Sequence, residues 1–386
     1  MPDSDNSLSR FFHDLGFYTV ADFLPAALGL VALIIFSHTF DPNAYGRYSL
    51  AIVFVSAVST AVFSWLEQAV LRFDSNSNDS LPTVITLLLL LSFGTIVLGA
   101  LLLSIFQPNL GEYRDFYAAS VFAVVGLGCF RVFRAVYQAR LRANRVTLYK
   151  STNALLKLSL SLALSFVVLR NITGWLWGTA IASILTALVM GLRLDVSTFE
   201  FDRSLIRRLV RYGGPMIGWL FGLTLLTFGD RILLEWLSST AAVGIYSSNY
   251  TLIQVGLPLV LSPVIQAAHP VIMDTWDGEN SEEIATLILE YSRYFLIIGV
   301  GATVAASILS RPLSTLILGT AFHSGYVIMP IIAAALFFWN FAMLGHKGLE
   351  LKEKTGLMSL GIFLSVIINV GLNYFLIPDW GYLGAA

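Results

Sequence analysis

Long apolar runs alternate with short polar segments along nearly the whole chain. An α-helix needs about 20 residues to cross roughly 30 Å of hydrocarbon. Eleven runs reach about that length, and they cover residues 16–37, 48–71, 82–106, 116–137, 149–169, 173–192, 212–236, 244–268, 291–309, 326–345 and 357–377. The pattern therefore predicts an all-α polytopic membrane protein with about eleven transmembrane helices.

The composition supports this class and excludes others. Of 386 residues, 56% are hydrophobic and only 12% are Asp, Glu, Lys or Arg. That is about half the charged share of a typical soluble domain, which excludes a soluble enzyme, a nucleic-acid-binding protein and a disordered linker. The net charge of −1 comes with no basic tail for a polyanion. The single cysteine, Cys129, excludes a disulfide framework and a cysteine-based metal site.

Positive charge is distributed unequally between the two ends of the predicted helices. Seventeen Lys and Arg residues fall on the side of the N-terminus and five on the opposite side. Cytoplasmic loops carry the excess of positive charge in membrane proteins, so we expect a cytoplasmic N-terminus. Residues 1–14 lack the basic start and the cleavage site of a secretory signal, which predicts that the first span is retained.

The chain also resembles itself at an offset of 198 residues. Ala-Tyr-Gly-Arg-Tyr-Ser at 44–49 corresponds to Ala-Val-Gly-Ile-Tyr-Ser at 242–247, and the Gln-Ala pairs at 68–69 and 266–267 keep the same offset. A second similarity links residues 174–180 to residues 381–386. Matches at both ends of one span in one register favour an internal repeat over coincidence.

This repeat predicts two pseudo-symmetric six-helix lobes. Residues 1–195 would form the first lobe with helices one to six, and residues 196–386 the second lobe with helices seven to eleven. Two such lobes are the architecture of an alternating-access carrier. Because the second lobe is one helix short, we expect that the twelfth helix is missing and that the C-terminus is truncated.

Several of these segments resemble a known family. They are residues 41–50 (Asp-Pro-Asn-Ala-Tyr-Gly-Arg-Tyr-Ser-Leu), 67–73 (Glu-Gln-Ala-Val-Leu-Arg-Phe), 212–215 (Tyr-Gly-Gly-Pro), 229–234 (Gly-Asp-Arg-Ile-Leu-Leu) and 380–386 (Trp-Gly-Tyr-Leu-Gly-Ala-Ala). Together they are similar to the polysaccharide branch of the multidrug/oligosaccharidyl-lipid/polysaccharide (MOP) exporter superfamily, the Wzx-type O-antigen flippases.

The resemblance implies a MOP exporter fold in the bacterial inner membrane. It also implies transport of undecaprenyl-diphosphate-linked oligosaccharide units for O-antigen, capsule or exopolysaccharide biosynthesis. The expected partners are this substrate, membrane lipids, and a polysaccharide polymerase and glycosyltransferases of the same pathway. A proton or sodium gradient is the implied energy source, with no cofactor. Flipping breaks no bond, and the chain shows no phosphate-binding glycine loop, so we expect that it is not an enzyme.

Ionisable residues inside the predicted spans are the candidate substrate-binding groups. Arg131 and Arg134 are three residues apart and share a helix face, and Lys157 lies about two turns into the fifth span. Together they predict a basic entrance for a diphosphate, although anchoring at the cytoplasmic interface is the alternative. Asp22 is either a cavity carboxylate that carries a proton or a hydrated residue at the interface. Arg47 either helps to receive the head group or anchors the outer end of its span.

Two further pairs are candidates for gating or ion coupling. Glu67 and Arg72 flank the inner end of the second span and are expected to pair. Asp230 and Arg231, near the outer end of the seventh span, either gate the periplasmic side or hold helix ends together.

Three functions compete at this point. A lipid-linked oligosaccharide flippase needs buried bases for its diphosphate, whereas a multidrug or cation antiporter of the same superfamily needs buried carboxylates. A membrane glycosyltransferase or ligase needs large outer loops or an acidic metal-binding cluster, and the outer loops of this chain are short. The basic residues Arg131, Arg134 and Lys157 favour the flippase.

Overall fold

The computed structural model of the chain describes residues 23–74, 80–106, 110–194, 201–276, 281–352 and 354–386. Every regular element within these residues is a helix. Ten of the described helical segments are long and apolar enough to cross a membrane, and a shorter apolar helix covers Phe23–Thr39. The prediction of an all-α, multi-pass membrane protein with about eleven helices is therefore confirmed.

The chain divides into two compact units, which we describe separately. The first unit contains residues 1–32 and 47–228, and the second contains residues 33–46 and 229–386. Three described helices contribute residues to both units, namely Phe23–Thr39, α2 (Pro42–Phe73) and α7 (Arg203–Leu237). The predicted boundary between residues 195 and 196, and the two six-helix lobes, stay a prediction.

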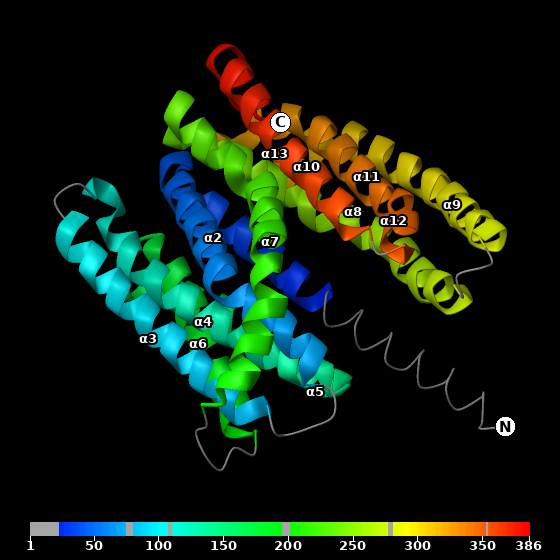
Figure 1. Cartoon of the computed structure of the whole chain (residues 1–386). Coiled ribbons are helices and arrows are strands. Elements are labelled where there is room, and N and C mark those ends of the chain that lie inside the picture. Colours follow the sequence, from blue (N-terminus) through cyan, green and yellow to red (C-terminus); the bar gives the residue numbers. More distant parts are fainter. Residues whose placement is uncertain (1–22, 75–79, 107–109, 195–200, 277–280, 353) are drawn as a thin grey trace. The chain divides into compact units, whose positions relative to one another are not determined.

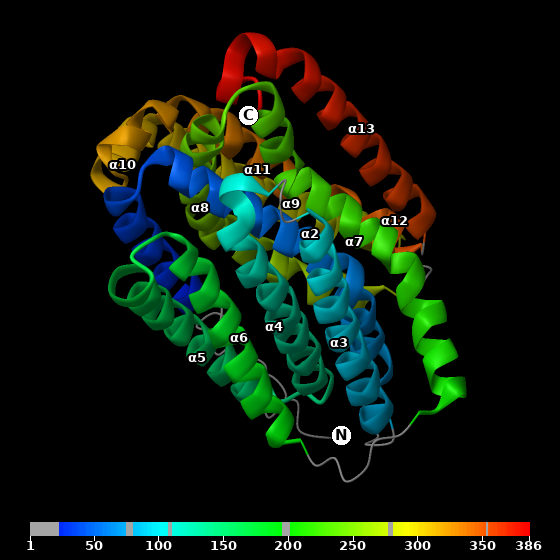
Figure 2. The same cartoon turned by 90° about the vertical axis from the view of Figure 1, so that its left-hand side faces the viewer.

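The first unit is built around three helices that pack closely on one another. Its remaining elements are α3 (Leu81–Phe106), η3 (Gly111–Tyr113), α4 (Arg114–Ala139), α5 (Ala143–Leu162), the π-helical turn η4 (Ala163–Val168) and α6 (Thr173–Leu192). Helix α6 packs on both α4 and α5 (Figure 2). Gly126 and Gly178 have no side chain to separate these backbones, and a Cβ on either glycine would overlap the neighbouring helix. Small residues are what allow helices to approach closely where lipid supplies no hydrophobic driving force.

The second unit contains a bundle of long helices and several short ones. Its elements are α8 (Thr240–Thr275), α9 (Ser281–Ile308), α10 (Ser310–Ile317), η5 (Thr320–Ile328), α11 (Met329–Gly345), α12 (Lys347–Leu351), α13 (Thr355–Trp380) and η6 (Gly381–Leu383). Helices α8, α9 and α11 pack together (Figure 1). Phe295 packs against both Phe337 and Phe341, with ring centroids 5.6 and 5.8 Å away.

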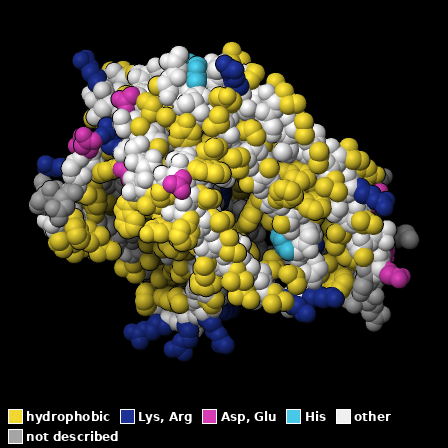
Figure 3. Space-filling model, turned by 90° about the horizontal axis from the view of Figure 1, so that it is seen from above, with side chains coloured by type: hydrophobic (Ala, Val, Ile, Leu, Met, Phe, Trp, Pro, Cys, Tyr) yellow, Lys and Arg dark blue, Asp and Glu magenta, His cyan; other side chains and the backbone are white. Residues whose placement is uncertain are grey.

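Apolar side chains also cover much of the outside of the molecule. Figure 3 shows a face that is mostly hydrophobic, with Lys and Arg side chains in small groups toward its edges. Large side chains such as Phe93, Ile297 and Phe375 expose more than half of their surface. Exposed apolar area of this extent is a liability in water, and it is the surface that a bilayer solvates.

Two segments of the internal repeat contact each other through their backbones. Within the second unit, the first turn of α2 approaches the first turn of α8. A Cβ on Gly46 would overlap the carbonyl oxygen of Thr240, and a Cβ on Gly244 would overlap that of Pro42. Gly46 corresponds to Gly244, and Pro42 to Thr240, at the offset of 198 residues. The same contact is therefore made twice with the roles exchanged, as at a two-fold axis.

The second sequence similarity, between residues 174–180 and 381–386, also corresponds to a contact in each unit. In the first unit, Tyr48 stacks on Trp175, with ring centroids 4.2 Å apart. In the second unit, the hydroxyl of Tyr246 lies 3.3 Å from the carbonyl oxygen of Ala385. Tyr246 corresponds to Tyr48 at the offset of 198 residues. Each of the two corresponding tyrosines thus contacts the repeated segment of its own unit. Tyr48 contacts residues 174–180, and Tyr246 contacts residues 381–386.

We expect that Gly46→Ala destabilises the protein, because the new methyl group has no room against Thr240. Overpacking of this kind costs about 1–3 kcal/mol. The melting temperature of the detergent-purified protein measures the effect. The matched control is Gly94→Ala in α3, where nothing lies within 4 Å of the added Cβ. Equal melting temperatures for Gly46→Ala and the wild type would contradict the close backbone contact.

Candidate functional site

A polar cavity of about 370 Å³ lies within the first unit. Helix α2 contributes Thr60, Ser64, Glu67 and Gln68 to its wall, α4 contributes Arg131 and Arg134, and α7 contributes a stretch from Leu220 to Phe228. Positions 60, 64, 67 and 68 are spaced by four, seven and eight residues, so they form one face of α2. These four positions thus form a polar stripe toward the cavity on a mainly apolar helix.

The cavity holds an ion pair and a second guanidinium. The Nη2 atom of Arg134 lies 2.7 Å from Oε1 of Glu67. The side chain of Glu67 is only 12% exposed, and that of Arg134 is 29% exposed. Arg131 lies close enough for its charge to interact with both Glu67 and Arg134. The prediction that Arg131 and Arg134 share one face is confirmed, since both line this cavity.

The two arginines have donors that no other described residue fills. The Nε atom of Arg134 is buried without a hydrogen-bond partner in the described part of the chain. Nor does any described residue form an ion pair with Arg131. An unused charged donor in a membrane protein is costly unless water or an anion occupies it. The described residues of the cavity thus carry two guanidinium groups and one carboxylate, which leaves an excess of positive charge.

The predicted pair of Glu67 and Arg72 is wrong. Glu67 pairs with Arg134 instead, and Arg72 is exposed. The reason is geometric: side chains three or four residues apart meet on a helix, whereas a spacing of five places them on different faces.

Lys157 lies in a different cavity, of about 210 Å³. Lys150, Asn153 and Lys157 line it from α5, together with residues of the helix Phe23–Thr39, Phe130 of α4 and Trp175 of α6. Phe130 and Arg131 are neighbours in sequence, yet they line separate cavities. The prediction that Lys157 joins the two arginines in one basic entrance is therefore wrong. The two cavities lie against different faces of α4, one lined by Phe130 and the other by Arg131.

The two remaining substrate-binding candidates lie elsewhere. Arg47, at the start of the part of α2 that belongs to the first unit, forms an ion pair with Glu112 of η3. Its side chain is 25% exposed and that of Glu112 is 77% exposed, which fits the interpretation of an interface anchor. Asp22 lies outside the described residues.

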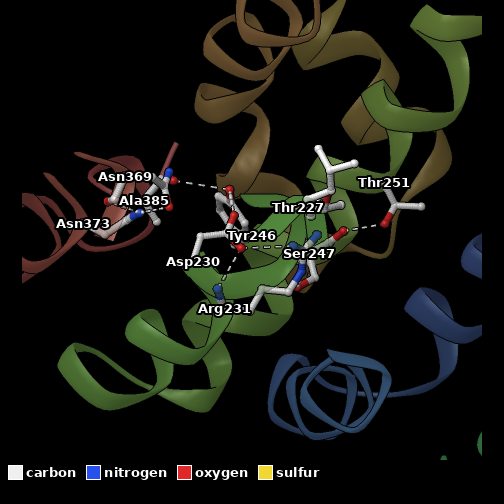
Figure 4. Close-up of polar contacts among 10 residues, drawn as sticks. Thr227, Asp230, Arg231, Tyr246, Ser247, Thr251, Asn369, Asn373 and Ala385 are labelled. Atoms are coloured by element: carbon white, nitrogen blue, oxygen red, sulfur yellow. Dashed lines mark hydrogen bonds and ion pairs between the residues drawn. The ribbon is translucent and has the colours of Figure 1, made fainter. Parts of the chain in front are cut away.

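Asp230 and Arg231 form the centre of a buried cluster in the second unit (Figure 4). Oδ1 of Asp230 accepts hydrogen bonds from the backbone N–H of Arg231 at 2.8 Å and from its Nη1 at 3.1 Å. The hydroxyl of Tyr246 donates to Oδ2 of Asp230. Nε of Arg231 donates to Oγ of Ser247 at 3.1 Å, and its guanidinium lies 4.7 Å from the ring centre of Tyr250. Both charges are thus surrounded by partners from α8.

Sequence reasoning found the charged centres of both sites and missed the polar residues around them. Thr60, Ser64 and Gln68 escaped notice because uncharged polar residues are common in membrane helices. Their helical spacing with Glu67 was the available signal. Tyr246 and Ser247 belong to the repeated Gly-Ile-Tyr-Ser segment, which marked them as structural without showing that they contact Asp230 and Arg231.

The chain belongs to the polysaccharide biosynthesis protein family, whose pattern matches residues 12–276, more than half of its length. No curated protein matches the chain.

Solved structures show the same fold at low sequence identity. The inward-facing conformation of a multidrug resistance MATE family transporter of the MOP superfamily is 16% identical, with a TM-score of 0.64, over 96% of this chain and 89% of that one. The lipid II flippase MurJ in an inward closed conformation is 14% identical, with a TM-score of 0.75, over 96% and 83%. The predicted resemblance is therefore confirmed at the level of the family, and the chain shares the fold of these MATE and MurJ structures.

We expect that Asp230→Ala lowers the melting temperature of the detergent-purified protein strongly. Removing one partner of a buried ion pair leaves the other charge uncompensated, which costs about 3–5 kcal/mol. The matched control is Glu112→Ala, which breaks the more exposed pair with Arg47 and should cost about 0–1 kcal/mol. Similar losses in the two variants would contradict the structural importance of the buried cluster.

Proposed function

We propose that the protein is a flippase that moves undecaprenyl-diphosphate-linked oligosaccharide units across the bacterial inner membrane for O-antigen, capsule or exopolysaccharide biosynthesis. Membership of the polysaccharide biosynthesis protein family supports this proposal. So does a fold shared with a MATE transporter and with the lipid II flippase MurJ. Alternating access, in which the substrate site opens to one side of the membrane at a time, is the mechanism that we propose with it.

The observation that carries the proposal is the pair of guanidinium groups in the polar cavity. The barrier to flipping is the transfer of a charged diphosphate and its sugars through hydrocarbon, which costs many kcal/mol without compensation. Arg131 and Arg134 supply compensating charge, and their planar groups match phosphate oxygens in pairs of hydrogen bonds. The prenyl tail needs no such help, because it can stay in the lipid.

The size of the cavity fits the diphosphate rather than the whole sugar unit. A volume of about 370 Å³ corresponds to roughly a dozen water molecules at about 30 Å³ each. That is room for two phosphate groups with some water. Binding of a larger oligosaccharide therefore requires a further opening, which alternating access supplies.

The position of the cavity along the helices fits uptake from the cytoplasmic leaflet. Glu67 lies six residues before the end of α2, and Arg134 five residues before the end of α4, which is about 8–9 Å at 1.5 Å per residue. Under the predicted orientation, with the N-terminus in the cytoplasm, these helix ends are cytoplasmic. The diphosphate would thus meet the arginines soon after leaving the inner leaflet.

Transport of this kind changes no covalent bond, so we propose that the protein is not an enzyme. We propose a proton or sodium gradient as the energy source, and membrane lipids, a polysaccharide polymerase and glycosyltransferases as partners. The buried Asp230–Arg231 cluster is the candidate for gating or ion coupling. A membrane glycosyltransferase or ligase, in contrast, would change the mass of the lipid-linked sugar during the assay.

A multidrug or cation antiporter is the competing function within the same fold. The cavity opposes it, since two guanidinium groups and one carboxylate leave an excess of positive charge that repels organic cations. Protection of cells against cationic drugs, with no effect on surface glycan, would favour the antiporter instead.

We expect that Arg131→Ala and Arg134→Ala each reduce flipping at least about tenfold, because each loses charge-assisted hydrogen bonds worth about 1.5–3 kcal/mol. The measurement is surface glycan in cells that lack their own flippase, with the membrane level of each variant matched by immunoblot. Arg131 has no ion-pair partner in the described part of the chain, so its removal leaves no carboxylate uncompensated.

Arg72→Ala is the matched control, because Arg72 is an exposed arginine on α2 that does not line the cavity. It should keep wild-type glycan levels. Normal glycan in both the Arg131 and Arg134 variants, at matched expression, would remove the cavity from the mechanism.

A further inference from the structure

Glu67 occupies the place beside Arg134 that a phosphate would take. Its carboxylate accepts a charge-assisted hydrogen bond from Nη2 of Arg134 at 2.7 Å inside the cavity. A carboxylate and a phosphate oxygen offer the same acceptor chemistry to a guanidinium. A ligand that uses Nη2 of Arg134 must therefore compete with Glu67, whereas Arg131 forms no ion pair with any described residue.

The two arginines are for this reason not equivalent toward a ligand. A single phosphate can bind Arg131 and leave the pair of Glu67 and Arg134 intact. A diphosphate has a second phosphate, which competes with the carboxylate for Nη2 of Arg134. The displaced carboxylate stays in a polar environment, because Ser64 and Gln68 lie on the same face of α2.

A carrier must also release what it binds. Two arginines around a doubly charged diphosphate would hold it tightly, and binding that is too strong stops transport. A carboxylate that returns to Arg134 lowers the affinity for the diphosphate and provides the group that replaces it when it leaves.

We propose that Glu67 is a resident competitor for Arg134 that the second phosphate of the substrate displaces and that returns to expel the substrate. This inference rests on the proposed function, since it concerns the same cavity and a lipid-linked diphosphate. It assigns Glu67 a role in release rather than in substrate contact. The role of Glu67 thus differs from that of Arg131 and Arg134, which bind the phosphates.

The test compares two ligands that differ by one phosphate. They are a short-chain prenyl-diphospho-N-acetylglucosamine and the corresponding prenyl-phospho-N-acetylglucosamine. Calorimetry with detergent-purified protein gives their affinities, and a labelled form of the first ligand in proteoliposomes gives the flipping rate at saturation. In Glu67→Gln we expect binding of the diphosphate to tighten about tenfold and binding of the monophosphate to change less than about threefold. The saturated flipping rate should fall.

This combination distinguishes the proposal from a structural role. A residue that only holds the fold would weaken binding when it is replaced, and a residue that contacts the substrate favourably would do the same. Glu67→Asp retains the charge and should keep the wild-type preference. Glu112→Gln removes a carboxylate from an ion pair outside the cavity and should change neither affinity.

A second variant tests the same idea in the opposite direction. Gln68→Glu adds a carboxylate to the same face of α2 in the cavity and disrupts no ion pair of the described residues. It should weaken binding of the diphosphate about tenfold. This variant keeps the proposal testable if Glu67→Gln does not fold.

The outcomes separate this inference from the proposed function. Unchanged or weaker diphosphate binding in Glu67→Gln, or tighter binding with an undiminished flipping rate, overturns the role of Glu67 while leaving the flippase intact. A wild-type protein that binds no diphosphate, with Arg131→Ala indistinguishable from it, overturns the proposed function and this inference together.

Discussion

The cost of an uncompensated charge at membrane depth governs the polar organisation of this protein. Hydrocarbon solvates neither guanidinium nor carboxylate groups, so each ionisable side chain within a span needs a partner or water. Arg134 meets this need through Glu67 on another helix, and Arg231 through Asp230 and the hydroxyl of Ser247. These pairs fix which helix faces turn inward, whereas the apolar remainder of each helix can face either lipid or a neighbouring helix.

The fold could be predicted from the sequence because a membrane helix satisfies its own backbone hydrogen bonds. Apolar length alone therefore locates it, and the span predicted at 173–192 coincides with α6 (Thr173–Leu192). The prediction of 244–268 for α8 was short at both ends, since the helix runs from Thr240 to Thr275. Ser239 caps it by accepting a hydrogen bond from the N–H of Ala242, a polar start that hydropathy does not register. The short α10 and η5 escaped because their 8 and 9 residues fall far below the length of a membrane span.

The candidate site was less predictable, because its contacts join residues far apart in the sequence. Glu67 and Arg134 lie 67 positions apart, and no local pattern connects them. Arg72 is close to Glu67 in the sequence, but a spacing of five residues places the two side chains on different faces of the helix. Charge alone groups Lys157 with the arginines. In the structure, Lys157 shares a cavity with Phe130 of α4, whereas the next residue, Arg131, lines the other cavity. Sequence reasoning thus identified the charges correctly and could not assign them to cavities.

The Arg231 cluster and the cavity of the first unit differ in how many arginine donors the described residues fill. The guanidinium of Arg231 contacts the carboxylate of Asp230, the hydroxyl of Ser247 and the ring of Tyr250, and its side chain is 4% exposed. An anion could enter there only by dismantling the cluster. In the cavity of the first unit, Arg131 has no ion pair with a described residue, and Nε of Arg134 has no hydrogen-bond partner among them. Both centres carry arginine, so charge does not separate them. Unfilled donors beside a polar cavity do, and this is why we propose Arg131 and Arg134, rather than Arg231, as the ligand site.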